Sequence, residues 1–77
     1  MVDSHQISDI KFEKNYMIIS VDEKELKVDL EHVSSKLLIA SDVERSLYQI
    51  SPSGYGIHWP LIDEDLSIVA LINMNHE

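Results

Sequence analysis

Residues 16–21 read Tyr-Met-Ile-Ile-Ser-Val, a run of aromatic, β-branched and apolar residues that is apolar on both sides at its centre. This composition is typical of a central β-strand. On either side, residues 9–13 and 26–31 alternate apolar with charged side chains, which predicts two half-buried strands. We therefore expect three antiparallel strands, joined by turns at Asn15 and at the charged residues 22–25.

The middle of the chain changes to a helical spacing. Apolar residues within 33–40 suit a short helix that begins at Ser34 or Ser35. Residues 41–44, Ser-Asp-Val-Glu, match a capping box, in which the serine hydroxyl accepts from the glutamate amide and the glutamate reaches back. A second short helix should therefore begin near Asp42.

The last third predicts two strands around a turn. Residues 47–50 suit a short strand, and Ser-Pro-Ser-Gly at 51–54 is a strong turn signal. Residues 55–59 predict a strand that ends at Pro60, because proline cannot donate to a ladder. Alternation along this strand places Gly56 and His58 on one face. The other face should carry Tyr55, Ile57 and Trp59.

The acidic step Asp63-Glu64-Asp65 precedes the apolar run 66–72. Negative charge ahead of an apolar run favours a helix N-terminus, so we expect these carboxylates to cap a C-terminal helix and to form a solvated acidic edge. Contact with a basic partner is the alternative. Metal binding is disfavoured, because consecutive carboxylates rarely converge on one ion without a loop that brings further ligands.

These elements predict an α+β fold: a small antiparallel sheet of about four to five strands, one or two short helices packed on it, and a short C-terminal helix. The 77 residues suit one domain, 1–77, with a core of about 7–72 and tails at 1–6 and 73–77. Trp59 is expected in the core, with an aromatic anchor on a partner surface as the alternative. The expected apolar face comprises Ile10, Phe12, Ile18, Leu26, Val28, Leu38, Leu47, Ile57, Trp59, Leu66 and Leu71.

Charge and composition bear on partners and location. Six basic against fourteen acidic residues give a net charge of −8, which repels phosphate backbones and anionic membranes and favours a basic protein partner. The basic residues form no patch for reading nucleic acid. The chain has no cysteine and shows no targeting segment, both of which fit a cytoplasmic protein.

No catalytic set is apparent. His58 beside the acidic step could serve as a general base, but the serines lie in caps and turns and none stands in a G-x-S-x-G elbow. The remaining histidines are scattered, so no histidine metal site is expected. The sequence predicts neither an enzyme nor a cofactor or metal. His58 is expected on the outer face, or bonded to a nearby carboxylate.

Residues 54–67, Gly-Tyr-Gly-Ile-His-Trp-Pro-Leu-Ile-Asp-Glu-Asp-Leu-Ser, resemble the hallmark of the domain-of-unknown-function 2442 family. These small bacterial domains carry a G-x-x-W-P-x-x-D-E-D-[IL]-S stretch close to the C-terminus. The preceding order is also similar: a strand hairpin, then a short helix with the pair Glu44-Arg45. The resemblance covers about Ile7 to Ile72. Its W-P-x-x-D-E-D-L-S core fixes the spacing of two rare residue types, Trp and Pro.

The resemblance implies an α+β fold with an antiparallel sheet and brings no established enzymatic activity. It implies domains that occur alone, fused ahead of a helix-turn-helix domain, or encoded beside another small domain in pairs like toxin–antitoxin modules. The sequence departs from the family pattern in two places. Residues 22–25 replace the usual Asp-Gly-like turn, and residues 68–71 are wholly apolar where relatives tend to show Val-Glu-Gly-Leu. A helix that is apolar all round requires burial on several sides, which suggests an additional interface.

The leading hypothesis is a non-enzymatic protein–protein interaction module of antitoxin-like or regulatory character, with a basic protein partner encoded beside it. Its candidate partner surface comprises Asp63, Glu64, Asp65, His58, Trp59 and Tyr55. One alternative is a small-ligand or metal-responsive sensor domain with a pocket near Tyr55, Gly56, His58 and Trp59. The other is a structural homodimer, paired through the helix Ile68–Ile72 or an exposed strand edge.

Overall fold

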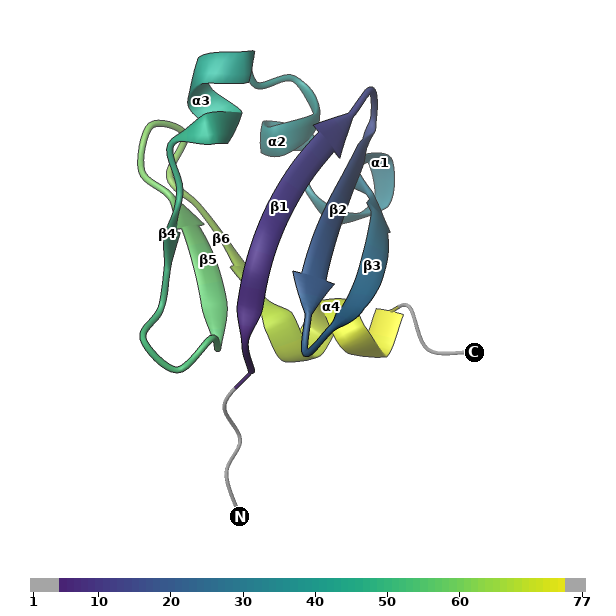
Figure 1. Ribbon diagram of the computed structural model, residues 1–77. Helices are drawn as coiled ribbons and strands as arrows, with labels where there is room; N and C mark the ends of the chain where they lie inside the picture. Colours follow the sequence, from purple (N-terminus) through teal and green to yellow (C-terminus); the bar gives the residue numbers. More distant parts are fainter. Residues whose placement is uncertain (1–4, 75–77) are drawn as a thin grey trace.

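The computed structural model describes residues 5–74 and confirms the α+β class. Two three-stranded antiparallel sheets face one another across the apolar core, and a C-terminal helix closes one end of the molecule (Figure 1). We expected one sheet of four to five strands. Residues 5–74 form six strands in two sheets. The helical segment 30–46 separates the first three strands from the last three, and each set pairs within itself.

The first sheet is a meander with the order β1-β2-β3. The hairpin between β2 and β3 closes through Asp22 and Glu23, which have φ values of 51° and 69°. Two successive residues with positive φ form the tight hairpin turn that matches the natural twist of the strands. The strands of this sheet are β1 (Ile7–Glu13), β2 (Tyr16–Val21) and β3 (Lys24–Asp29).

Three short helices follow, and a side-chain cap defines where each begins. At the first, the Asp29 carboxylate accepts from the Glu31 amide at 3.0 Å. The hydroxyl of Ser34 accepts from the Leu37 amide, as a helix N-cap does. The predicted capping box is confirmed, because Ser41 accepts from the Glu44 amide while the Glu44 carboxylate accepts from the Ser41 amide. The helices are α1 (Leu30–Val33), α2 (Ser35–Leu38) and α3 (Asp42–Ser46).

The second sheet has the order β4-β5-β6, with β4 (Gln49–Ile50), β5 (Gly56–Trp59) and β6 (Glu64–Ser67), and α4 (Ile68–Met74) follows directly. The prediction that the acidic step caps this helix is wrong. Asp63 has a φ of 53° in the turn that closes the β5–β6 hairpin, and residues 64–67 then pair with β5. The hydroxyl of Ser67 accepts from the Ala70 amide instead, as an N-cap does.

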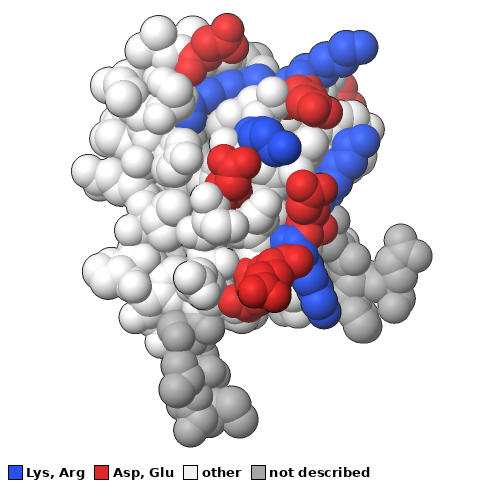
Figure 2. Space-filling view, in the orientation of Figure 1, with Lys and Arg blue, Asp and Glu red and all other residues white. Residues whose placement is uncertain are grey.

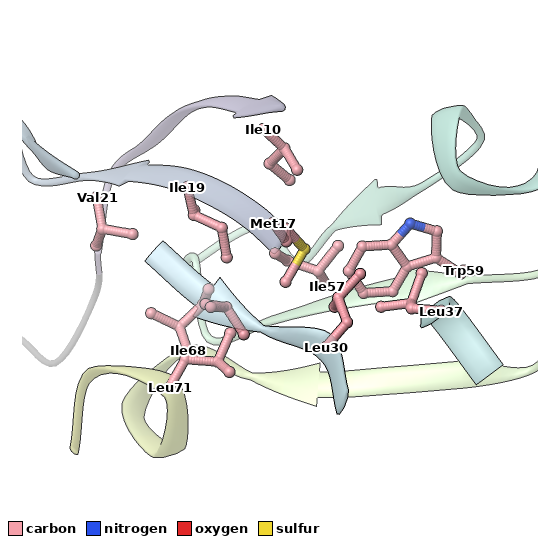
Figure 3. Close-up of a cluster of buried hydrophobic side chains, with 11 residues drawn as sticks. Ile10, Met17, Ile19, Val21, Leu30, Leu37, Ile57, Trp59, Ile68 and Leu71 are labelled. Carbon is pink, nitrogen blue, oxygen red and sulfur yellow. The ribbon is translucent and has the colours of Figure 1, made fainter. Parts of the chain in front are cut away.

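The core lies between the two sheets (Figure 3). Trp59 is fully buried there, and its indole N–H donates to the Arg45 carbonyl at 3.0 Å, so the core assignment of the tryptophan is confirmed. Two expected core residues are placed differently. Leu47 lies half exposed at the C-cap of α3, and Ile18 is only half-buried, because β2 turns its odd-numbered residues inward. The buried apolar residues absent from the expected set are Met17, Ile19, Val21, Leu30, Leu37 and Ile68.

The arginine of the Glu44-Arg45 pair is a structural residue. The side chain of Arg45 is buried and donates to the carbonyls of Lys14, Leu37 and Leu38 at 3.0–3.2 Å, while its guanidinium lies 5.0 Å from the Phe12 ring centre. A buried cation requires such partners to offset its lost hydration. Arg45 thus ties α2 and α3 to the β1–β2 turn.

Two further findings concern the chain ends and the helices. Within the expected N-terminal tail, the His5 amide donates to the Ser53 carbonyl and the Gln6 amide to the Asp22 carboxylate. Residues 1–4 and 75–77 of the expected tails lie outside the described residues. Within residues 5–74, none of the helices has the length and apolar composition needed to cross a bilayer.

Candidate functional site

A shallow groove with a volume of about 670 Å³ crosses the outer face of the second sheet. Strand register explains its shape. Gly56 pairs with Ser67 on one side, and on the other its carbonyl accepts from the Ser51 amide. Directly paired residues point to the same face of a sheet, so Gly56 and Ser67 form a row of small residues across β5 and β6. Ser51, the residue after β4, continues this row. This row of Ser51, Gly56 and Ser67 is the floor of the groove.

The neighbouring row forms a polar wall. Gln49 pairs with His58, and His58 pairs with Asp65, so the three side chains line up along one side of the floor. Pro52 and Tyr55, from the turn between β4 and β5, line the opposite side. The groove therefore combines exposed apolar surface with one carboxylate.

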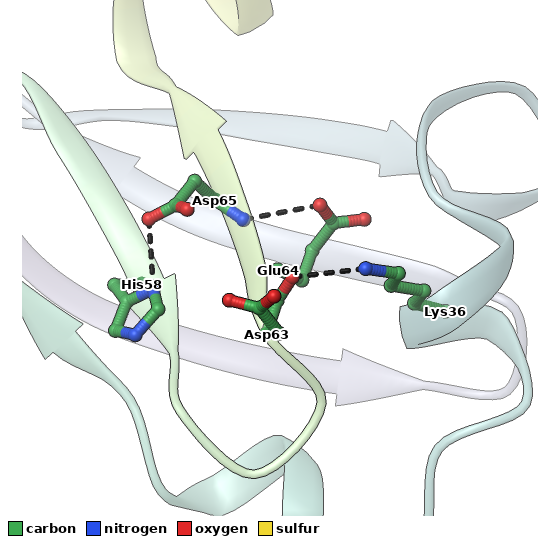
Figure 4. Close-up of polar contacts among 5 residues, drawn as sticks. All are labelled: Lys36, His58, Asp63, Glu64 and Asp65. Atoms are coloured by element: carbon green, nitrogen blue, oxygen red, sulfur yellow. Dashed lines mark hydrogen bonds and ion pairs between the residues drawn. The ribbon is translucent and has the colours of Figure 1, made fainter.

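His58 and Asp65 form a bonded pair within that wall (Figure 4). The His58 Nδ1 atom lies 2.8 Å from one Asp65 carboxylate oxygen, and the side chains are 37 % and 75 % exposed. The expectation that His58 bonds a nearby carboxylate is confirmed. The sequence did not indicate which of the three carboxylates it would be. The second Asp65 oxygen has no hydrogen-bond partner among residues 5–74.

The other two acidic residues point elsewhere. The Glu64 carboxylate accepts from the Ser34 hydroxyl and the Asp65 amide on the core side of the sheet, so this side chain holds β6 against the helical segment. Asp63 is exposed in the turn, where its carbonyl accepts from the Lys36 ammonium at 2.9 Å (Figure 4). The acidic step thus serves three separate purposes, and only Asp65 lines the groove.

The predicted surface position of Trp59 and the predicted strand face of Tyr55 require correction. Trp59 cannot contact a partner, because alternation along β5 turns it into the core. Tyr55 was expected on the same face as Trp59, yet it is 54 % exposed and lines the groove. The reason is that Tyr55 precedes β5, in a turn where the Ser51 hydroxyl accepts from the amides of both Tyr55 and Gly56. The strand alternation begins one residue later.

Other groove residues have no signal in the sequence. Gln49, Ile50, Ser51, Pro52 and Ser67 are ordinary strand and turn residues, and only the pairing of β4 and β6 with β5 brings them together. A row of small residues across neighbouring strands is invisible until the register is known.

The chemical resources of the groove are modest. The Ser51 hydroxyl is engaged by two backbone amides, so it is poorly placed to attack a substrate. Within the described part of the chain, no group of three or more His, Cys, Asp or Glu side chains could hold a metal ion. The arrangement offers a flat floor, an exposed aromatic ring and a carboxylate with a free oxygen, which are features that suit binding.

Comparison with known proteins identifies a family and a fold. The model of a family described as "Protein of unknown function (DUF2442)" matches residues 7–77. A crystal structure of a protein of unknown function from Rhodospirillum rubrum is similar, with a TM-score of 0.72 and 21 % identity over 94 % of this chain and 89 % of that one. At this identity the similarity shows the fold alone. No curated protein matches the chain.

Proposed function

The chain belongs to the DUF2442 family of proteins of unknown function, and on that premise we propose that it is a non-enzymatic interaction module whose acidic surface docks a basic protein partner. An antitoxin-like or regulatory role is the form that the family resemblance suggests. The observation that carries the proposal is the uneven distribution of charge between the two sheets.

The second sheet belongs to a part of the chain that is poor in basic side chains. Residues 46–77 contain no lysine or arginine, although they include the carboxylates of Asp63 and Asp65. In Figure 2 the flank where β4 and β5 lie shows neither basic nor acidic side chains on the face in view, whereas acidic and basic side chains are interspersed over the first sheet. A basic partner would therefore meet the Asp65 carboxylate on a sheet that supplies no lysine or arginine of its own, although the Lys36 ammonium lies beside Asp63 at one end of that sheet.

Few of the carboxylates are paired with a basic group among the described residues. Among residues 5–74, every ion pair joins a histidine to an aspartate, and none uses lysine or arginine. Three of the six basic side chains are engaged by other groups: Arg45 and Lys36 donate to carbonyls, and Lys27 lies 4.5 Å from the centre of the Tyr16 ring. The excess of acidic groups thus remains available to another molecule, where complementary charge raises the association rate and specificity.

One observation also favours the sensor alternative. The groove brings together Tyr55, Gly56 and His58, three of the four residues assigned to a ligand pocket from the sequence, and its volume lies in the range of small-molecule sites. The groove is shallow and open, however, whereas such sites enclose most of their ligand. We therefore favour a macromolecular partner.

The proposal is tested by capture from a lysate of the source cell with the tagged full chain as bait. Capture of a basic protein should be strong at about 50 mM salt and fall several-fold at about 500 mM, because salt screens exposed charges. Neutralising the second sheet with Asp63→Asn and Asp65→Asn together should reduce capture. The matched control, Asp9→Asn with Glu13→Gln on β1, removes the same charge from the first sheet and should leave capture nearly unchanged.

If the two double variants lose capture of the partner to the same extent, the effect comes from net charge in general. That result would contradict a docking surface on the second sheet. The absence of any salt-sensitive partner would contradict the proposal as a whole. Sedimentation of the pure chain tests the homodimer alternative, which predicts a stable dimer at micromolar concentration.

A further inference from the structure

The groove supports a more specific statement, which rests on the proposed function. We propose that it binds an extended segment of the partner protein, with an arginine side chain that lies across the floor, stacks on Tyr55 and pairs with Asp65. Three features of the groove lead to this assignment.

The first feature is the flat floor. Gly56 has no side chain, and Ser51 and Ser67 on either side of it are small, so the floor is bare across β5, β6 and the residue that follows β4. A Cβ atom on Gly56 would lie 3.0 Å from the Leu66 carbonyl oxygen, closer than ordinary contact allows. A side chain at this position would thus be crowded. Because glycine leaves the backbone uncovered, a planar group can approach it here, and the guanidinium of arginine is planar and weakly hydrated.

The second feature is the pair of recognition groups at the sides of the groove. The Tyr55 ring is exposed, and arginine stacks on aromatic rings. Asp65 stands across the floor, its carboxylate anchored through one oxygen by His58 while the other oxygen has no partner among the described residues. An anchored carboxylate loses less side-chain freedom when a cation binds, and it accepts a strong charge-assisted bond.

The third feature is the free edge of β4, which adjoins the groove. The Ser51 amide donates to the Gly56 carbonyl, and two residues earlier Gln49 pairs with His58. In an antiparallel ladder the residue between two such pairs directs its N–H and C=O away from the partner strand. Ile50 therefore presents main-chain groups to an incoming extended segment.

Charge decides between possible occupants. A second copy of this chain would bring a further −8 charge to an acidic surface, and arginine occurs in it only at the buried Arg45. A basic segment of another protein has the opposite charge and can supply the guanidinium. We therefore assign the groove to a heterologous partner.

The experiment is a titration of the ¹⁵N-labelled full chain with the blocked peptide acetyl-Leu-Arg-Leu-amide, followed by amide chemical shifts. Shifts should concentrate at Ile50, Tyr55, Gly56 and Asp65. The same peptide with citrulline in place of arginine keeps the shape and loses the charge, and it should bind about fivefold more weakly, since an exposed ion pair contributes modestly.

Two variants sharpen the test. Asp65→Asn keeps an oxygen that can accept from His58 but removes the charge, and it should weaken binding about fivefold. Asp63→Asn removes the same charge two residues away, outside the groove, and should change affinity less than about twofold. An undisturbed spectrum of each free variant verifies folding.

Equal weakening by the two variants, equal binding of the citrulline peptide, or shifts that lie outside the groove would each overturn this assignment. So would the absence of shifts at millimolar peptide. If the peptide experiment contradicts the groove assignment while salt-sensitive capture of a basic partner persists, the proposed function stands. The docking site then lies elsewhere on the acidic surface. Loss of the capture as well would remove both proposals.

Discussion

The two sheets differ in how their structure is specified. The first has strands of six or seven residues joined by tight turns, and it mixes lysines with carboxylates. The second has strands of two to four residues, no lysine or arginine, and a long turn between β4 and β5. The pattern of neighbouring residues is enough to predict the strands of the first sheet. The strands of the second sheet are defined by contacts between residues far apart in the sequence. The candidate binding surface lies on the sheet whose strands are short.

Trp59 is the residue on which this comparison depends most. Trp59→Ala should lower the free energy of unfolding by about 3–5 kcal/mol, because it empties a large buried volume and leaves the Arg45 carbonyl without its donor. A domain of this size has a net stability of roughly 3–5 kcal/mol, so the variant should be largely unfolded in both sheets. Urea denaturation followed by circular dichroism measures the loss.

Trp59→Phe is the control, since it keeps an aromatic ring in the core and removes the indole N–H, and it should cost less than the alanine variant. A variant in which β1–β3 keeps its folded signals while the second sheet melts would show that the sheets are independent. That result would contradict a shared core.

A single substitution in the turn between β2 and β3 should stabilise the protein. Glu23 has a φ of 69°, which costs a residue with a side chain about 1 kcal/mol relative to glycine. Glu23→Gly creates an Asp-Gly pair, the preferred sequence for this type of turn, and should raise the free energy of unfolding by about 0.5–1 kcal/mol. Glu25→Gly removes the same charge from strand β3 and should destabilise. Stabilisation by both variants would indicate relief of charge repulsion instead.

The smallest expected effect is the pH dependence of the stability that Asp22 contributes in the same turn. Hydrogen bonds from the His5 ring and the Gln6 amide lower the pKa of Asp22 below its ordinary value of 3.8. A carboxylate with a lowered folded-state pKa contributes stability above its unfolded pKa, and that contribution is lost as the pH falls through the folded value. Asp22→Asn should therefore be less stable than the native chain at neutral pH, and the difference should vanish in strong acid.

Urea midpoints measured from neutral to acid pH test this expectation. Asparagine tolerates the positive φ of 51° at this position, so the turn is retained. The matched control is Asp9→Asn, an exposed carboxylate on β1 for which the structure shows no hydrogen bond. A difference between native and Asp22→Asn chains that stays constant down to strong acid would contradict the role assigned to the carboxylate.

The candidate site shows what sequence reasoning could reach. Strand alternation correctly directs His58 outward, and the acidic step correctly supplies its partner. Which of three consecutive carboxylates faces His58 depends on the turn at Asp63, because a shift of one residue in the hairpin moves every side chain of β6 to the other face. The wrong prediction of the face on which Tyr55 lies has a similar cause. The hydrogen bonds from the Tyr55 and Gly56 amides to the Ser51 hydroxyl hold Tyr55 in the turn, outside the strand.

The amino-acid sequence by itself determined the first three strands, the caps at Ser34 and Ser41, and the end of β5 at Pro60, because alternation, capping and the missing proline amide act between near neighbours. Tertiary structure alone decided that six strands divide into two sheets and that residues 64–67 pair as a strand. It also decided that small residues of β5, β6 and the turn after β4 meet in a groove. These outcomes depend on register and on a shared core, which are long-range properties.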